Sequence, residues 1–170
     1  MLRTNTAMRR LLGSAVFATD QPSVPEWEQD TLDAGWTVEP SGALLLVAHR
    51  PTSMHDIPAA ALGEGEYEVN DVHVSLADLG GEPADLLPRA ASRGLYFARR
   101  MLAAARGLPG AELLLATVAV HVDVDDEDFA LQGVTVRFFT RRGSYPDWFD
   151  ELETFTLEAI AVLDVSDVTT

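Results

Sequence analysis

The chain has 170 residues, a length typical of one domain. It carries 27 acidic and 12 basic residues, a formal net charge of −15, and 47% hydrophobic residues. The apolar content excludes a disordered chain, and the absence of cysteine excludes disulfides and thiolate metal sites. The negative charge disfavours binding to nucleic acid or anionic membranes. Because no apolar run reaches the roughly 18 residues of a membrane span, we expect a cytoplasmic protein.

The domain organisation is predicted from the N-terminus onward. Residues 1–20 are predicted to form an N-terminal helix or arm, residues 21–165 a single α+β domain, and residues 166–170 a tail. The segment before Asp20 contains arginines but no acid, and its apolar residues recur at helical spacing. A targeting peptide is the alternative, because Leu11–Ala18 is a short apolar run that follows these arginines.

The next segment predicts a helix and a hairpin. Trp27–Ala34 is predicted to be a short acidic helix that ends at Gly35. Trp36–Glu39 and Ala43–His49 are apolar segments on either side of a Pro-Ser-Gly turn, a pattern typical of two paired strands.

The middle of the chain predicts a loop, a strand and a long helix. Pro51–Gly65 contains two prolines and two glycines, so a loop is expected. Tyr67–Leu76 alternates apolar and polar residues like a strand, with a change of phase at Asn70-Asp71 that would fit a bulge. Pro83–Arg106 is the longest helical pattern in the chain.

The C-terminal part predicts a second hairpin and a last helix. Leu113–Val124 and Phe129–Arg141 alternate as strands on either side of an acidic turn. Trp148–Leu163 has apolar residues at helical spacing and acids in its first turn, which favours a helix. A strand over 154–162 is the alternative, because Thr, Ile and Val are frequent there.

These elements define an α+β fold class: an antiparallel sheet of about five strands with a long middle helix and a C-terminal helix, in the order α-β-β-β-α-β-β-α. This order, together with size and acidity, resembles the type III secretion chaperone-like fold, including the bacterial YbjN-like family. The resemblance covers nearly the whole chain as element order, and no sequence motif supports it. It implies a small, acidic, often dimeric protein that binds other polypeptides and performs no chemistry.

Histidines and acids provide candidate metal ligands. His73 and His121 lie on the polar faces of two predicted strands, and Asp123 lies beside the second, so a zinc or iron site would form if those strands were neighbours. The acidic run Asp123–Asp128 offers oxygen ligands for calcium or magnesium, but it lacks the EF-hand spacing and fits a solvated turn better. We therefore expect no metal and no cofactor.

Two surfaces are candidate partner sites. Arg89, Arg93, Tyr96 and Arg100 fall on one face of the long predicted helix, opposite its apolar face. Such a stripe would recognise a carboxylate-rich or phosphorylated partner, or would pair with acids of this chain. Trp148 and Phe149 are predicted to be core residues, or a partner surface if they are exposed.

Nucleophile elbows and phosphate-binding loops are absent from the sequence. We therefore predict a non-enzymatic, acidic protein-binding domain, chaperone-like or an adaptor, that forms a homodimer and holds a polypeptide partner, which would be basic by charge complementarity. The alternatives are an immunity-type inhibitor of a basic toxin domain and, with less support, a metal-dependent enzyme that uses His73 and His121.

Overall fold

The structure, a computed structural model, describes residues 2–13, 23–50, 58–125 and 133–168. Its centre is a five-stranded antiparallel sheet in the order β1-β7-β5-β6-β4. The strands are β1 (Arg3–Thr4), β4 (Asp71–Val74), β5 (Leu114–His121), β6 (Val134–Thr140) and β7 (Glu158–Asp164). A two-stranded hairpin, β2 (Trp36–Val38) and β3 (Leu44–Leu46), forms a separate sheet.

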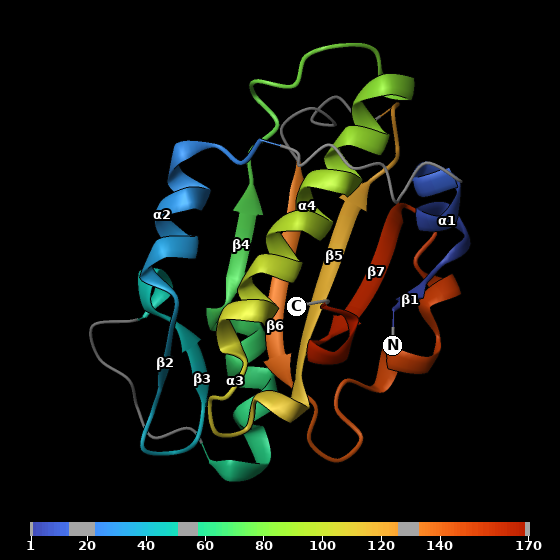
Figure 1. Ribbon diagram of the computed structural model, residues 1–170. Helices are drawn as coiled ribbons and strands as arrows, with labels where there is room; N and C mark the ends of the chain where they lie inside the picture. The colour runs from blue at the N-terminus through green and yellow to red at the C-terminus, as the bar shows by residue number, and fades with distance from the viewer. Residues whose placement is uncertain (1, 14–22, 51–57, 126–132, 169–170) are drawn as a thin grey trace.

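Four α-helices surround this sheet in the described part of the chain: α1 (Thr6–Leu12), α2 (Glu26–Ala34), α3 (Leu62–Val69) and α4 (Pro83–Ala105). The long helix α4 crosses one face of the sheet, with α1 and α2 on either side of it, as Figure 1 shows. The predicted α+β class, long middle helix, acidic helix before Gly35 and both hairpins are confirmed. None of the helices described here combines the length and the apolar character needed to cross a membrane.

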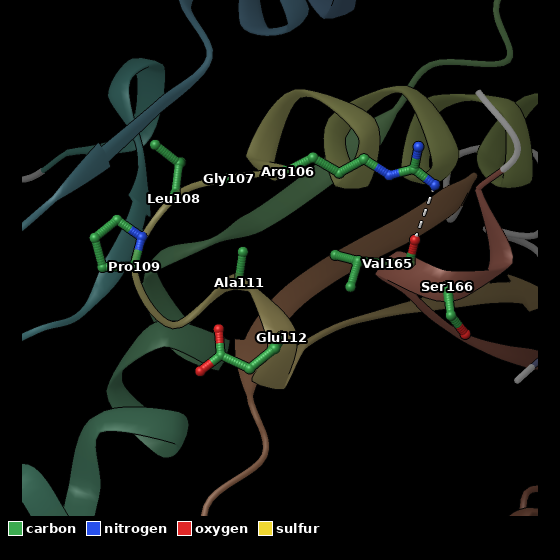
Figure 2. A pocket seen from close by; sticks show the side chains of 8 residues that line it. All are labelled: Arg106, Gly107, Leu108, Pro109, Ala111, Glu112, Val165 and Ser166. Atoms are coloured by element: carbon green, nitrogen blue, oxygen red, sulfur yellow. Dashed lines mark hydrogen bonds between the residues drawn. The ribbon is translucent and has the colours of Figure 1, made fainter.

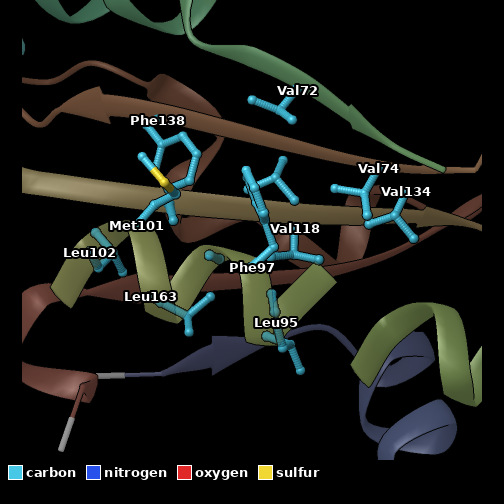
Figure 3. Packing of buried hydrophobic residues seen from close by; sticks show 14 of the residues in the cluster. Val72, Val74, Leu95, Phe97, Met101, Leu102, Val118, Val134, Phe138 and Leu163 are labelled. Atoms are coloured by element: carbon cyan, nitrogen blue, oxygen red, sulfur yellow. The ribbon is translucent and has the colours of Figure 1, made fainter. Parts of the chain in front are cut away.

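The main core lies between α4 and the sheet. Phe97, Met101 and Leu102 of α4 have no exposed surface and meet valines of β5 and β6 (Figure 3). At Gly94 the helix comes so close to the sheet that a Cβ atom would lie 2.5 Å from a methyl carbon of Val134. Glycine is required there for close packing, not for a special backbone conformation.

The predicted C-terminal helix over Trp148–Leu163 is wrong. The chain instead forms two 3₁₀ turns, Asp147–Asp150 and Leu152–Thr154, followed by strand β7. Because β7 lies between β1 and β5 and is covered on both faces, its residues 159–163 are all buried and show no polar alternation. Such a run has no period of its own and can be mistaken for part of a helix. The strand alternative is right from Glu158 onward.

The predicted strand Tyr67–Leu76 is right only in its centre. Its first residues, Tyr67–Val69, end helix α3, and only Asp71–Val74 pair with β6. Helix α3 also includes Leu62–Gly65, which was predicted to be loop, whereas residues 51–57 of that loop lie outside the described residues. The glycine at position 63 allows α3 to approach β6, since a Cβ there would lie 2.5 Å from the carbonyl oxygen of Thr140.

Two buried side chains, one in α3 and one at its C-cap, join the hairpin sheet to the main sheet. Glu66 accepts hydrogen bonds from the N–H of Leu44 (2.8 Å) and from the N–H and hydroxyl of Thr140 (2.5 and 2.6 Å). Asn70 accepts from the N–H of Leu46 (2.9 Å) and donates to the carbonyls of Leu44 (2.8 Å) and Phe138 (3.1 Å). These side chains occupy the place of a strand between β3 and β6, which is why the hairpin does not join the main sheet as predicted.

The N-terminal segment is part of the same sheet. Strand β1, which the sequence did not indicate, pairs with β7, and Met8 of α1 is fully buried in the main core. Asn5 connects the two: its side-chain oxygen accepts from the N–H of Met8 and of Ile160, and its amide nitrogen donates to the carbonyl of Glu158. The predicted helix therefore exists as α1 up to Leu12, and residues 14–20 lie outside the described residues.

Candidate functional site

The face of the sheet opposite α4 differs from the packed one because it carries polar residues. Strand pairing places Thr117 of β5 beside Arg137 of β6, and Asp71 of β4 on the other side of Arg137. Further along, His121 of β5 pairs with Glu158 of β7. Part of this second face is covered by aromatic side chains, and the rest is a surface of mixed polarity.

An aromatic cluster forms the cover of this face. It consists of rings from α3, from β6 and from the segment between β6 and β7: Tyr67, Phe139, Tyr145, Trp148 and Phe155. The rings meet mostly edge to face, with centroids 5.4–6.3 Å apart, the arrangement that ring quadrupoles favour. Phe139 is fully buried, whereas the other four residues are half-buried.

A cavity of about 100 Å³ lies between this cluster and the strands. Tyr67, Trp148 and Phe155 line it from the cluster, and Thr117 and Thr135 line it from the sheet. The side chains of Arg137 and Glu158 also reach it. The cavity is therefore lined by aromatic residues on one side and by threonine, arginine and glutamate residues of the sheet on the other.

The guanidinium of Arg137 is held in one orientation. Its Nε and Nη2 donate to the same Asp71 oxygen at 3.0 and 2.8 Å, and its Nη1 donates to the hydroxyl of Tyr67 at 3.1 Å. The guanidinium carbon also lies 5.0 Å from the centroid of the Tyr67 ring, a cation–π distance. Asp71 and Tyr67 thus fix where the remaining donors of Arg137 can point.

Exposed acidic residues lie on α3 and in the chain segment that supplies Trp148. Glu64 and Glu68 are exposed on α3, and Asp147 and Glu151 are exposed next to Trp148 in the chain. Burial, together with the negative field of Tyr67, Glu64 and Glu68, raises the pKa of Tyr145 to about 12. Exposed carboxylates therefore lie near the cluster on α3 and beside Trp148 in the chain.

The arginine stripe predicted on the long helix is mostly used within the chain. Arg93 has no exposed surface, and its two terminal nitrogens bind both oxygens of Asp78 at 2.6 and 2.7 Å. Arg89 is exposed and donates to the carbonyls of Leu79 and Gly80, so both arginines fasten the loop before α4. Arg100 is exposed and donates to the hydroxyl of Tyr96 at 2.8 Å.

The two predicted aromatic contact residues have different positions. Trp148 is half-buried and belongs to the aromatic cluster. Phe149 is only 7% exposed and lies against two guanidiniums, those of Arg3 at 4.3 Å and Arg141 at 3.8 Å from its ring centroid. Trp148 can therefore contact a partner, whereas Phe149 is covered.

The histidines that were candidate metal ligands do not come together. His73 lies on β4 and His121 on β5, on the same face, but β6 separates these strands. Two strand spacings amount to roughly 10 Å, too far for shared coordination of one ion. No group of three or more His, Cys, Asp or Glu side chains that could hold a metal occurs in the described part of the chain. Asp123 accepts the N–H of Asp125, as in a solvated turn, and residues 126–128 lie outside the described residues.

A wider depression of about 410 Å³ lies at the C-terminal end of α4, between residues 106–112 and the segment after β7 (Figure 2). Arg106 extends across it and donates to the carbonyl of Val165 at 3.3 Å and to that of Val168. Glu112 is exposed at its edge. Because this guanidinium is bound to backbone carbonyls, the depression offers fewer oriented polar groups than the cavity at Arg137.

Sequence reasoning did not single out Tyr67, Arg137 or Glu158. Arg137 lies between the apolar residues Val136 and Phe138 in a predicted strand, so its position on the polar face could be predicted. Its partners were not, because Tyr67 belongs to a helix predicted as strand and Glu158 to a strand predicted as helix.

Comparison with known proteins gives no match: no family model, no curated protein and no solved structure is significantly similar to this chain. The resemblance to chaperone-like proteins therefore stays a prediction from element order.

Proposed function

We propose that this protein is a non-enzymatic, acidic binding domain of the chaperone-like or adaptor type, which holds a basic polypeptide partner against the aromatic cluster. The observation that carries the proposal is the combination of half-buried aromatic rings with uncompensated acids around them. Partner surfaces commonly combine aromatic anchors at their centre with charged groups at their margin.

The use of arginine within the chain supports a basic partner. In the part of the chain that is described, the arginine ion pairs engage five acids: Glu39, Asp71, Asp78, Asp150 and Glu153. The exposed acids next to the cluster, Glu64, Glu68, Asp147 and Glu151, have no arginine partner among these pairs. A partner that brings arginine or lysine would meet both unbalanced carboxylates and half-exposed rings suited to cation–π contact.

The test is affinity capture from the native host with the purified chain, followed by association rates measured with the captured polypeptide across a salt series. We expect a basic polypeptide whose association rate falls steeply with added salt, because exposed charges are screened beyond about 8 Å at physiological ionic strength. An immunity-type inhibitor would use the same complementarity, and a captured toxin domain would identify it.

Variants of matched charge locate the surface. The double substitution Glu64→Gln and Glu68→Gln should slow association, and Trp148→Ala should speed dissociation. The double substitution Glu82→Gln and Asp85→Asn removes the same charge from the start of α4 and should leave both rates nearly unchanged. An association rate that is indifferent to salt, or equal losses in both double variants, would rule out this surface.

Duplex DNA is not expected to bind, and a mobility-shift assay checks this.

A further inference from the structure

The outer face of α4 is a second surface, which the proposed docking of a basic partner does not use. Helix α4 crosses one face of the sheet (Figure 1), and the aromatic cluster covers part of the opposite face. Residues 86–111, which include most of α4, contain no Asp or Glu, and this is the longest such stretch in a chain of net charge −15. The outer face of α4 is therefore a local exception to the acidic character of the protein.

Two arginines on this face have no acidic partner. Arg93 is buried against Asp78, and Arg89 donates to two loop carbonyls, so both are engaged within the chain. Arg100 is exposed and Arg99 is half-buried, and neither takes part in an ion pair among the described residues. Because 27 acids face only 12 arginines, a shortage of carboxylates does not explain why these two are left unpaired.

Tyr96 lies between the two arginines and adds a hydroxyl group. At about 100° per residue, Arg99 and Arg100 lie on either side of Tyr96 around the outer face of the helix. The Tyr96 oxygen accepts from Nη1 of Arg100 at 2.8 Å, and its own O–H has no acceptor in the described part of the chain. Of the five N–H groups of each guanidinium, Arg100 uses one and Arg99 uses none within the described residues.

These groups define the chemistry of a partner. A guanidinium with unused donors binds a carboxylate in a forked, charge-assisted pair, and a phenol O–H donates to a further oxygen. Helix α2, beside α4, carries exposed acids such as Glu26 and Asp30, which would repel a long polyanion. We infer that the arginine pair, Arg99 and Arg100 with Tyr96 between them, is a docking surface for a short acidic segment of a polypeptide, with one carboxylate on each arginine.

The dimensions of the arginine pair also favour a short peptide segment. From Tyr96 to Arg100 the helix axis advances by about 6 Å, at roughly 1.5 Å per residue. In an extended peptide, side chains two residues apart point to the same side and lie about 7 Å apart, so two acids separated by one residue match this length. A DNA duplex carries a charge every 1.7 Å or so along its axis and would extend onto the acids of α2.

The test uses the full chain and the probe peptide acetyl-Glu-Ser-Glu-Ser-Glu-amide, followed through the Nε–H resonances of the arginines. The peptide should shift the resonances of Arg99 and Arg100 in a saturable manner. Those of Arg3 and Arg141, which lie over Phe149 on the opposite face, should stay in place. The same peptide with glutamine in place of glutamate should bind at least about tenfold more weakly, because the forked pairs need carboxylates. If the resonances of the arginine pair do not move, the docking surface is overturned, whereas the proposed basic partner is unaffected.

Variants of matched charge locate the binding. The double substitution Arg99→Gln and Arg100→Gln should weaken peptide binding by about tenfold or more. Glutamine has nearly the helix propensity of arginine, so α4 should be retained. The control, Arg3→Gln with Arg141→Gln, removes the same charge from the opposite face and should leave binding nearly unchanged. Equal losses in both double variants would mean that net charge alone decides, and would refute the site.

Two other occupants are recognised by the same variants. A single-stranded pentanucleotide that binds more tightly than the peptide, and is lost in the Arg99→Gln and Arg100→Gln variant, would assign the surface to nucleic acid. A salt-sensitive dimer of the chain, measured by sedimentation and abolished by that variant, would assign it to a second copy. Either result would overturn the acidic polypeptide as the occupant.

Discussion

Replacing Glu66 by glutamine tests whether α3 substitutes for a strand between the two sheets. All partners of the Glu66 carboxylate are donors: the N–H groups of Leu44 and Thr140 and the hydroxyl of Thr140. A glutamine offers one oxygen and one NH₂ group, so whichever way it turns, one buried backbone N–H loses its acceptor. An orphaned buried donor costs about 1–3 kcal/mol, and we expect Glu66→Gln to lower the free energy of unfolding by that amount.

We also expect the stability difference between wild type and Glu66→Gln to depend on pH. Burial raises the pKa of Glu66 above its ordinary value of 4.5, although bonds from Thr140 and Leu44 oppose the shift. The folded state therefore holds this proton more tightly than the unfolded state, and the stability that Glu66 contributes falls as pH rises through its folded-state pKa. Glutamine has no such titration, so the stability difference between wild type and variant should narrow as pH rises through that range.

The assay is urea unfolding at several pH values, with two variants for comparison. Glu68→Gln makes the same change at an exposed position of α3 and should alter stability by less than about 0.5 kcal/mol. Asn70→Asp places a carboxylate against the carbonyls of Leu44 and Phe138, and should cost about 3 kcal/mol or more. If Glu66→Gln costs no more than Glu68→Gln, the reasoning about α3 is refuted.

Three further predictions concern the core and its attachments. Asp78→Asn deprives the buried Arg93 of its partner and should cost about 1–2 kcal/mol. Because Arg93 lowers the pKa of Asp78, this contribution is present above the ordinary pKa of that group and is lost as pH falls, so urea unfolding should show a difference that vanishes in acid. Gly94→Ala should destabilise by about 1 kcal/mol or more despite the better helix propensity of alanine, and Val134→Ala in the same chain should recover part of the loss; additive costs would contradict the contact. Phe155→Ala should cost about 2 kcal/mol in thermal or urea unfolding, below the roughly 3–5 kcal/mol of a fully buried phenylalanine, and a change near zero would place the ring outside the cluster.

The sequence correctly predicted the elements in which apolar residues recur at a regular spacing or in which a residue such as glycine marks the end. Helix α4 has a clear helical period, and α2 ends at Gly35, whose φ of +68° suits glycine. Strands β5 and β6 alternate because one face packs on α4 while the other is partly open. In these elements the burial of side chains and the local preference of the chain agree, so the sequence was sufficient.

The sequence was misleading where tertiary contacts decide. Strand β7 is buried on both faces, so its sequence contains no alternation of polar and apolar residues. Gly63 looked like a loop residue because the close approach of Thr140 is invisible in one dimension. The sequence did not predict the candidate site for the same reason. Arg137 acquires its orientation from Asp71 and Tyr67, which belong to a strand and a helix remote from it in sequence.

The pairing of β1 with β7 constrains the synthesis of the chain. Asn5 and the strand before it bind residues 155–162, so the sheet cannot close until β7 has left the ribosome. Until then the nascent chain would expose the apolar edge of β5 (Leu114–His121), which can pair with any other extended segment. Contacts this distant in sequence also form slowly. Chaperone dependence during translation and aggregation of chains cut before residue 158 are therefore the expected consequences of pairing β1 with β7.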